Sequence, residues 1–373
     1  MNKQFAKDFI IPLAESAGIK VNGQEPWDIQ IHDDAFYTRV LGEGALGLGE
    51  SYMDKWWDCP RLDIFFTRLL TSRIDEKVKN PFRVYLRHLL SKLIDYQSKA
   101  RAKEVAYKHY DIGNDLFSLM LDRRMMYSCG YWKEVNTLAE AQEAKLDLIC
   151  RKLQLAPGQR LLDIGCGWGG LARYAAERYG VSIVGITISA QQKEYAATYC
   201  KGLPIDIRLQ DYRDINEKFD RIVSVGMFEH VGHDNYPIYM KTARQLLRDN
   251  GLFLLHTIGL NETGSFINEW TTKYIFPNGM LPSIAQIAKS AEKWFVIEDW
   301  HNFGAYYDNT LTAWHENFNK HWSRLKNSYD ERFYRMWNYY LLSCAGGFRA
   351  RSMQLWQILL SPNGVSGGYD SIR

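Results

Sequence analysis

Short apolar runs of strand length alternate with amphipathic stretches through the middle of the chain. The expected strands are 160–164, 182–187, 205–210, 221–225 and 252–257, and the expected helices are 170–179, 190–199 and 236–248. Strands that alternate with helices form right-handed βαβ units. The pattern therefore predicts an open, mostly parallel sheet that binds ligands at the carboxyl ends of its strands.

The two ends of the chain show different patterns. Residues 1 to about 75 alternate short apolar clusters with Gly-rich turns, which predicts a small, mainly helical N-terminal domain. Within it, Gly42-Glu-Gly44-Ala-Leu-Gly47 matches G-x-G-x-x-G, but no strand precedes it, so we interpret it as a structural turn. The aromatic-rich residues from about 258 to 373 are expected to form helical insertions or caps over the ligand-binding edge.

An amphipathic basic segment separates the two regions. From 81 to 96 the apolar residues recur at helical spacing, while Arg83, Arg87 and Lys92 lie on another face. Such a helix either rests on anionic lipid headgroups or is a linker that packs on its own protein. The expected domains are a helical domain over 1–80, this linker over 81–98, and a catalytic domain over 99–373.

Composition limits the class of protein. The chain has 373 residues with 46% hydrophobic and 24% charged residues, which fits a globular protein of two domains. A net charge of +3 is too small to indicate a nucleic-acid partner. No apolar run reaches the roughly 18 residues of a membrane span, and the apolar stretch 9–14 is too short for a secretory signal.

The cysteines carry no pairing signal. All six are scattered without a C-x-x-C pair, which favours a reducing cytoplasm and predicts neither a metal site nor a disulfide framework.

A glycine-rich loop follows the first expected strand. Asp163-Ile-Gly165-Cys166-Gly167-Trp168-Gly169 ends that strand and opens a helix, and its glycines allow a ligand to approach the backbone closely. The form D-x-G-x-G-x-G resembles the first motif of Rossmann-like methyltransferases, whose ligand is S-adenosylmethionine.

The next two strand ends supply further candidate contacts to that ligand. No acidic residue ends the second strand, so Thr187 and Gln192 are expected to offer polar contacts instead. Tyr212 either stacks on the adenine or is an ordinary half-buried aromatic residue. The expected cofactor-binding residues are Tyr127, Ser128, Asp163, Gly165, Cys166, Gly167, Trp168, Gly169, Thr187, Ser189, Gln192, Gln210, Asp211 and Tyr212.

Several longer motifs extend the resemblance. They are Gly47-Leu-Gly49-Glu-Ser-Tyr-Met-Asp, Tyr110-Asp-Ile-Gly-Asn-Asp-Leu-Phe117, Tyr127-Ser128-Cys129-Gly-Tyr131-Trp132, Gly226-Met-Phe-Glu229-His230-Val-Gly232, His256-Thr257-Ile258-Gly259, Tyr274-Ile-Phe-Pro-Asn-Gly279 and Trp300-His-Asn-Phe303. Together they resemble the bacterial cyclopropane-fatty-acyl-phospholipid synthases along nearly the whole chain. The resemblance implies an α/β fold, a Rossmann-like class I methyltransferase with a mostly parallel sheet, plus the helical N-terminal domain.

The resemblance also implies a reaction. A methyl group passes from S-adenosylmethionine to the cis double bond of a phospholipid acyl chain, and the resulting carbocation loses a proton and closes a cyclopropane ring. Aromatic side chains favour a developing cation and exclude water. The candidates for such walls are Tyr131, Trp132, Tyr274, Phe303 and Tyr307.

In this family the base that removes the proton is thought to be bound bicarbonate. By similarity it is enclosed by Cys129, Glu229, His256, the backbone of Ile258, and Tyr307. Structural alternatives are that Glu229-His230 caps a helix and that His256 is a satisfied strand-end histidine. Cys344 occupies a position regarded as an active-site cysteine in relatives, although a buried packing role explains it as well.

Two alternative functions and several partners follow from the same resemblance. A related lipid methyltransferase would stop at a methyl-branched chain, and an inactive homologue would only bind lipid. The expected partners are the phospholipid bilayer and its unsaturated acyl chains, with a homodimer as the assembly. The expected location is the cytoplasm, at the inner face of the membrane.

Overall fold

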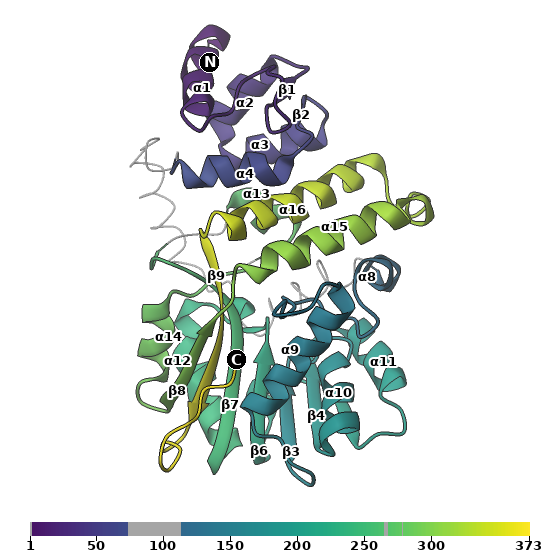
Figure 1. Ribbon diagram of the computed structural model, residues 1–373, viewed down its shortest axis with the longest axis vertical. Helices are drawn as coiled ribbons and strands as arrows, with labels where there is room; N and C mark the ends of the chain where they lie inside the picture. Colours follow the sequence, from purple (N-terminus) through teal and green to yellow (C-terminus); the bar gives the residue numbers. More distant parts are fainter. Residues whose placement is uncertain (1, 74–112, 265–267, 278) are drawn as a thin grey trace. The chain divides into compact units, whose positions relative to one another are not determined.

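The computed structural model describes residues 2–73, 113–264, 268–277 and 279–373 (Figure 1). The predicted basic helix over 81–96, and with it the linker over 81–98, lies outside these residues. The chain divides into two compact units. The first comprises the described residues of Met1–Tyr96, Ile267–Pro277 and Leu311–Met353, and the second those of Gln97–Phe266, Asn278–Thr310 and Gln354–Arg373. The units therefore combine segments that the sequence analysis kept apart.

The second unit is built around a seven-stranded sheet with the order β5-β4-β3-β6-β7-β9-β8. Its strands are β3 (Arg160–Ile164), β4 (Ser182–Thr187), β5 (Ile205–Leu209), β6 (Phe219–Val225), β7 (Leu247–Leu260), β8 (Val296–Asn302) and β9 (Met353–Ser361). The pairs β3–β4, β4–β5, β3–β6 and β6–β7 are parallel, whereas β8 and β9 pair antiparallel. The predicted mostly parallel sheet is thus confirmed, and each of the five expected strands forms.

Alternate residues of the central strands enter two hydrophobic cores. Leu162 and Ile222 pack with α12 (Tyr236–Leu246) and α14 (Ile284–Ala291). Their neighbours Leu161 and Val223 pack with α9 (Leu138–Lys152) and α10 (Gly170–Tyr179) instead. Because both faces are covered, the strands are apolar at consecutive positions, which is the pattern of a buried parallel sheet.

The helices of this unit begin and end at capping residues. A capping box of Thr137 and Glu140 opens α9, and the Ser189 side chain caps α11 (Ala190–Tyr199). Left-handed glycines flank α10, with Gly169 before it and Gly180 after it. Short elements complete the unit: α8 (Asn114–Met120), η2 (Tyr212–Asp214), η3 (Phe228–His230) and η4 (His233–Asn235).

One expectation for the end of the chain is wrong. Residues 258 to 373 are not only helical insertions, because β8 and β9 complete the sheet. From Gln354 to Ser361 every residue of β9 is buried. A strand buried on both faces lacks the alternation that reveals a strand in a sequence.

The first unit is mainly helical, as predicted for the N-terminal region. Its helices are α1 (Lys3–Glu15), α2 (Ala35–Glu43), α3 (Ala45–Met53), α4 (Leu62–Thr71), α13 (Glu269–Tyr274), α16 (Glu331–Arg349) and the Leu311–Leu325 part of α15 (Tyr306–Leu325). Two-residue strands β1 (Gln30–Ile31) and β2 (Trp57–Asp58) pair antiparallel. Gly44 separates α2 from α3 and Gly47 lies inside α3, so the G-x-G-x-x-G match follows no strand.

Close contacts join the distant segments of the first unit. The Phe66 ring of α4 meets the Tyr339 ring of α16 edge to face, with centroids 5.1 Å apart. A β-carbon added to Gly346 would lie 2.6 Å from Phe66 Cβ, so α16 approaches α4 where it has no side chain. None of the helices in the described ranges combines the length and apolar character that crossing a membrane requires.

Candidate active site

Among the described residues, the buried polar atoms that have no hydrogen-bond partner include three at the carboxyl ends of the central strands. They are Asp163 Oδ2 at β3, Glu229 Oε2 after β6 and His256 Nε2 on β7. Neighbouring strand ends bring the last two together, since Val225 pairs with His256. Because a buried polar group without a partner costs free energy, these atoms mark a place where a polar ligand binds.

The glycine-rich loop begins at Asp163, which is 2% exposed. Burial raises the pKa of its carboxyl to about 7. After it, Gly165, Gly167 and Gly169 all adopt positive φ angles, of 87°, 53° and 85°. A β-carbon at Gly165 would lie 2.9 Å from Met227, whereas one at Gly167 would meet no atom of the described residues within 4 Å. No described residue therefore fills the space beside the loop at Gly167.

Aromatic residues form one wall beside this loop. Trp168 is buried, and its indole nitrogen donates to Asn114 Oδ1 at 2.8 Å. The Phe117 ring packs against both Trp168 and Tyr127, with centroids 4.9 and 5.1 Å apart. Two predicted cofactor residues, Tyr127 and Trp168, thus share one wall. Cys166 points elsewhere, since its Cβ lies 3.1 Å from where Gly185 would carry a β-carbon.

At the end of β4, the predicted polar residues bind one another. Thr187 Oγ1 donates to Gln192 Oε1 at 2.8 Å and accepts from the Ser189 backbone N–H at 3.2 Å. The Gln192 N–H donates in turn to Ser189 Oγ. These three residues form one small network at the entrance to α11.

At the end of β5, the residues predicted to contact the adenine bind other residues of the protein. Asp211 forms a bidentate ion pair with Arg213, whose two guanidinium nitrogens donate to its two carboxylate oxygens at 2.8 and 2.7 Å. Gln210 donates to the Asp214 carbonyl. Tyr212 is buried against Tyr239, in the hydrophobic core. Its role beside the adenine stays a prediction.

Glu229 lies in η3, directly after β6. Its Oε1 accepts the Ile258 backbone N–H at 2.7 Å. Burial raises the pKa of this carboxyl to about 7. The structure therefore brings Glu229 and Ile258 together, with the predicted backbone donor engaged by the carboxylate.

His256 is 1% exposed, and its tautomer is set by a residue that sequence reasoning missed. The amide nitrogen of Gln357, on β9, lies 3.3 Å from His256 Nδ1. An amide nitrogen only donates, so Nδ1 accepts and Nε2 carries the ring proton. Burial, with Lys145, Lys152 and His301 nearby, lowers the pKa of His256 well below its ordinary value. The imidazole is thus neutral, with its Nε2–H free to donate. No motif in the sequence pointed to Gln357, because its strand was not predicted.

Cys129 is fully buried, and burial raises the pKa of its thiol. Thr310, which is also fully buried, organises the surrounding backbone. Its hydroxyl accepts from the Gly130 N–H at 3.0 Å and from the Trp132 indole at 2.9 Å, and lies 3.8 Å from Cys129 Sγ. Tyr307 is 8% exposed in the first turn of α15. Thr310 was not predicted, because a lone threonine in a helix has no distinguishing pattern.

Two predicted residues belong to the other compact unit. Cys344 lies on α16, where burial raises the pKa of its thiol to about 12. Tyr274 lies at the end of α13, and its hydroxyl donates to Glu50 at 2.7 Å. Among the remaining aromatic candidates, the Tyr131 ring meets the Phe303 ring edge to face at 5.3 Å, and Phe303 meets the His256 ring at 5.8 Å.

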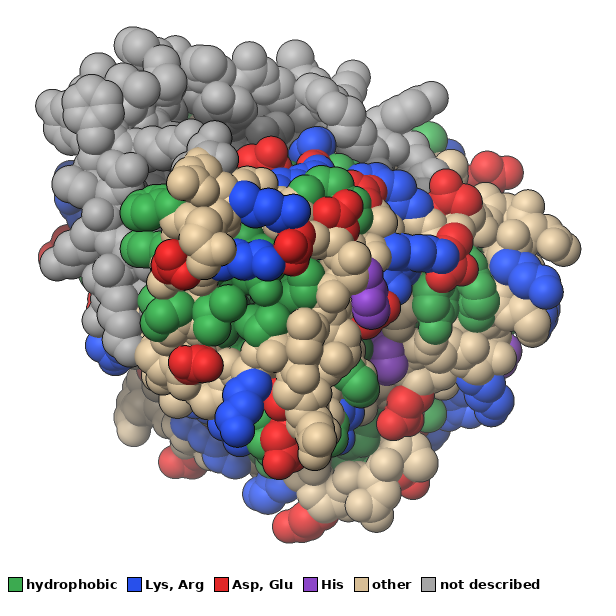
Figure 2. Space-filling model, turned by 90° about the horizontal axis from the view of Figure 1, so that it is seen from above, with side chains coloured by type: hydrophobic (Ala, Val, Ile, Leu, Met, Phe, Trp, Pro, Cys, Tyr) green, Lys and Arg blue, Asp and Glu red, His purple; other side chains and the backbone are tan. Residues whose placement is uncertain are grey.

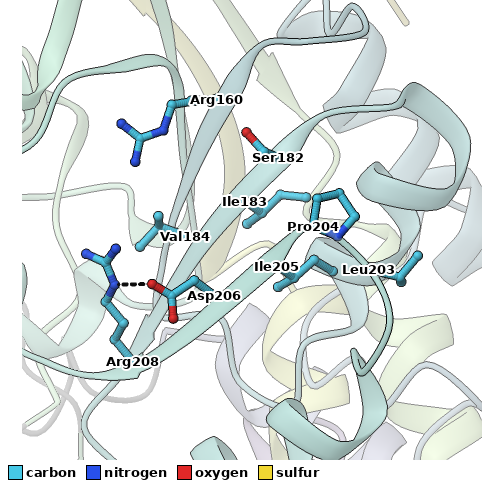
Figure 3. A pocket seen from close by; sticks show the side chains of 9 residues that line it. All are labelled: Arg160, Ser182, Ile183, Val184, Leu203, Pro204, Ile205, Asp206 and Arg208. Carbon is cyan, nitrogen blue, oxygen red and sulfur yellow. Dashed lines mark hydrogen bonds and ion pairs between the residues drawn. The ribbon is translucent and has the colours of Figure 1, made fainter.

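A shallow hollow at the amino ends of β3, β4 and β5 is a different feature (Figure 3). Its charged side chains are already paired, since Arg208 binds Asp206 at 2.6 Å and Arg160 binds Glu217 at 2.6 Å. Open α/β sheets bind ligands at the opposite edge. We therefore place the active site at the carboxyl ends.

Known proteins are similar to this chain over most of its length. The sequence model of the family described as mycolic acid cyclopropane synthetase matches residues 97–358. A cyclopropane-fatty-acyl-phospholipid synthase of Escherichia coli is 56% identical over 356 residues, covering 95% of this chain and 93% of that protein.

Solved structures of cyclopropane synthases are also similar to this chain. The cyclopropane synthase MmaA2 of Mycobacterium tuberculosis is 34% identical, with a TM-score of 0.67, over 72% of this chain and 99% of that chain. The mycolic acid cyclopropane synthase CmaA1, solved with SAH and CTAB, is 33% identical, with a TM-score of 0.66, over 69% of this chain and 97% of that chain. The chain therefore belongs to the cyclopropane-fatty-acyl-phospholipid synthase family of S-adenosylmethionine-dependent methyltransferases.

Proposed function

We propose that this protein transfers a methylene group from S-adenosylmethionine to the cis double bond of an unsaturated phospholipid acyl chain, forming a cyclopropane ring. The observation that carries the proposal is the set of unpartnered buried atoms at Asp163, Glu229 and His256. They lie at the carboxyl ends of the strands, the edge at which open α/β sheets bind ligands. Membership of the synthase family gives the site its substrate class.

The proposed reaction requires the protein to position the alkene and to exclude water from the active site. An isolated alkene is a weak nucleophile, so it must be held in line with the sulfonium methyl group that S-adenosylmethionine supplies. The buried rings of Tyr131 and Phe303 exclude water that would capture a carbocation, and their faces favour positive charge.

The residues around His256 fit a bound bicarbonate, which when present would supply the base for the proton that the new methyl group loses. His256 Nε2–H is a buried donor for an oxyanion, and Glu229 Oε2 is a buried acceptor for a hydroxyl. Cys129 and Tyr307 are buried and are proposed to complete the enclosure. Ile258 acts through Glu229, because its N–H holds that carboxylate in place.

We further propose that the protein works at the inner, cytoplasmic face of the membrane as a homodimer. Figure 2 looks onto the face that carries the N-terminal helices, where hydrophobic side chains lie exposed among Lys, Arg, Asp and Glu. On α1, Phe5 and Phe9 are 59% and 39% exposed, one turn apart. Aromatic side chains so placed support contact with the bilayer surface, and a dimer would double that contact.

Mass spectrometry of the lipid product tests the function. The full-length protein is incubated with vesicles of an unsaturated phospholipid and S-adenosylmethionine carrying a trideuterated methyl group. A cyclopropane product gains one carbon, keeps two of the three deuterium atoms and has lost the double bond. A methyl-branched chain that keeps all three deuterium atoms and still has a double bond, because the cation lost its proton from the acyl chain itself, would establish the related methyltransferase instead. Binding of the cofactor with no lipid product would identify an inactive lipid-binding homologue.

A further inference from the structure

Two lysines lie on the buried face of α9, two helical turns apart. Lys145 and Lys152 are both fully buried. A buried ammonium group is costly unless it has partners. Lys152 has an ion pair with Asp299 at 3.4 Å and contacts His301 Nδ1 at 3.0 Å. Lys145 instead donates to the Ser128 hydroxyl at 2.8 Å, its one hydrogen bond in the described part of the chain.

This contact fixes the direction of the Ser128 hydroxyl. An ammonium group has donors and no acceptor, so Ser128 Oγ must accept, and its own proton is left for another acceptor. One turn before Lys145, Gln142 donates to the Ser128 carbonyl at 2.8 Å. Both the side chain and the backbone of Ser128 are therefore held by α9.

Ser128 lies between Tyr127, on the wall of the glycine-rich loop, and Cys129. We propose that Lys145 is a positioning residue that keeps Ser128 as a hydrogen-bond donor toward the carboxylate of bound S-adenosylmethionine. A carboxylate accepts only, and the nearby ammonium charge complements it. The inference rests on the proposed function, because it takes this site as the cofactor site.

The charge state of Lys145 makes the arrangement sensitive to pH. Burial lowers the pKa of Lys145 to about 8, against the attraction of Asp122, Cys129 and Asp163. Above that pH the neutral amine accepts the hydroxyl proton, and Ser128 can no longer donate to the cofactor. Of the other groups facing Lys145, Asp163 titrates closest to this range, and its titration is shared by Ser128→Ala. The pKa of Asp163 is raised to about 7, that of the Cys129 thiol is raised above its ordinary value, and that of His256 is lowered.

Calorimetric titration of the full-length protein with S-adenosylhomocysteine, which keeps the carboxylate and cannot react, tests the inference. Lys145→Met is expected to raise the Kd about tenfold, the loss of roughly one charge-assisted hydrogen bond. Ser128→Ala should have a similar effect, and adding Lys145→Met to it should change little more, because the lysine acts through the serine. Lys152→Met is the matched control and should bind within about twofold of the wild type.

The pH profile gives a second and independent measurement. Wild-type affinity is expected to fall above about pH 8 more steeply than the affinity of Ser128→Ala. The ligand's own amine titrates in both experiments, so it affects both proteins equally. This comparison decides the question even if Lys145→Met does not fold. Equal slopes, wild-type affinity in a folded Lys145→Met protein, or an undiminished effect of that change on the Ser128→Ala background would each overturn the inference. Failure of the wild type to bind the ligand at all would instead refute the proposed function.

Discussion

At the scale of single residues, the site depends on polar groups that the fold buries without giving them full partners. Among the described residues, Glu229 uses one carboxylate oxygen for the Ile258 backbone and has no partner for the other. His256 likewise uses Nδ1 for Gln357 and leaves Nε2 unpaired. Each residue is thus held firmly by one atom and is free to bind a ligand with the other. Such groups lower the stability of the protein without ligand, which is common at functional sites.

Glu229→Gln should separate cofactor binding from turnover. The amide can still accept from Ile258 but can no longer bear a negative charge. We expect the affinity for S-adenosylhomocysteine to stay near that of the wild type and turnover to fall about a hundredfold or more. The matched control is Glu298→Gln, since Glu298 also accepts a backbone N–H, from Val365 at 2.8 Å. Equal losses of binding and turnover would count against the role given to Glu229.

The same substitution should change how stability depends on pH. Burial raises the pKa of Glu229 from 4.5 to about 7, so between these values the folded state keeps a proton that the unfolded state has lost. Folding stability therefore falls as pH rises through this window, by about 3 kcal/mol in total. Glu229→Gln removes the loss, so thermal unfolding should show the variant gaining stability relative to the wild type between about pH 5 and about pH 8. A constant difference across this range would show that the carboxyl of Glu229 is not buried as described.

At the scale of elements, β3, β4, α10 and α11 form over the predicted residues, because each carries a local signal. The strands are short apolar runs, and the glycines around α10 mark its ends. Strand β9 was not predicted, because it is buried along nearly its whole length and lies near the end of an aromatic-rich region. Its absence from the prediction also hid Gln357, whose importance comes only from lying opposite His256.

Gly167 and Gly170, three residues apart, should give different defects when changed to alanine. A β-carbon at Gly170 would lie 2.2 Å from the Arg124 carbonyl oxygen, so Gly170→Ala should destabilise the fold by roughly 2 kcal/mol or more. Gly167→Ala meets no atom within 4 Å in the described part of the chain and should cost only about 1 kcal/mol for its positive φ. It should nevertheless weaken cofactor binding, because its methyl group enters the space left for the ligand. Thermal unfolding and calorimetric titration check the pair, and intact affinity in Gly167→Ala would contradict this placement of the cofactor.

At the scale of the whole molecule, the first unit is assembled from distant parts of the chain. Arg335, on α16, donates to the Tyr52 and Trp57 carbonyls and to Asp58, at 2.6, 3.0 and 2.7 Å. A chain that begins near Lys99 would lose α4 and leave the α16 residues that pack on it without cover. We therefore expect truncation to reduce stability as well as activity on vesicles, so point changes separate the two effects better.

Removing exposed aromatic residues from α1 should reduce action on vesicles alone. Phe5→Ser with Phe9→Ser leaves the buried face of α1 intact, and burial of two phenylalanines in lipid would be worth about tenfold or more in affinity. Vesicle sedimentation and turnover on vesicles should fall together, with an unchanged unfolding temperature. The control is Ile238→Ser, since Ile238 on α12 is 49% exposed. Full vesicle activity in the double variant would assign α1 another purpose.

The sequence by itself determined the parallel sheet, the glycine-rich loop and the motifs that carry the family, because these depend on local spacing of apolar residues and glycines. It also named Glu229 and His256, through a resemblance. Only the tertiary structure decided which groups are left unpaired, that Ile258 binds Glu229, and that Gln357 sets the proton on His256. It also decided that Lys145 donates a hydrogen bond to the Ser128 hydroxyl. Burial and hydrogen bonding between strands far apart in the chain arise from packing, so neither can be deduced from neighbouring residues.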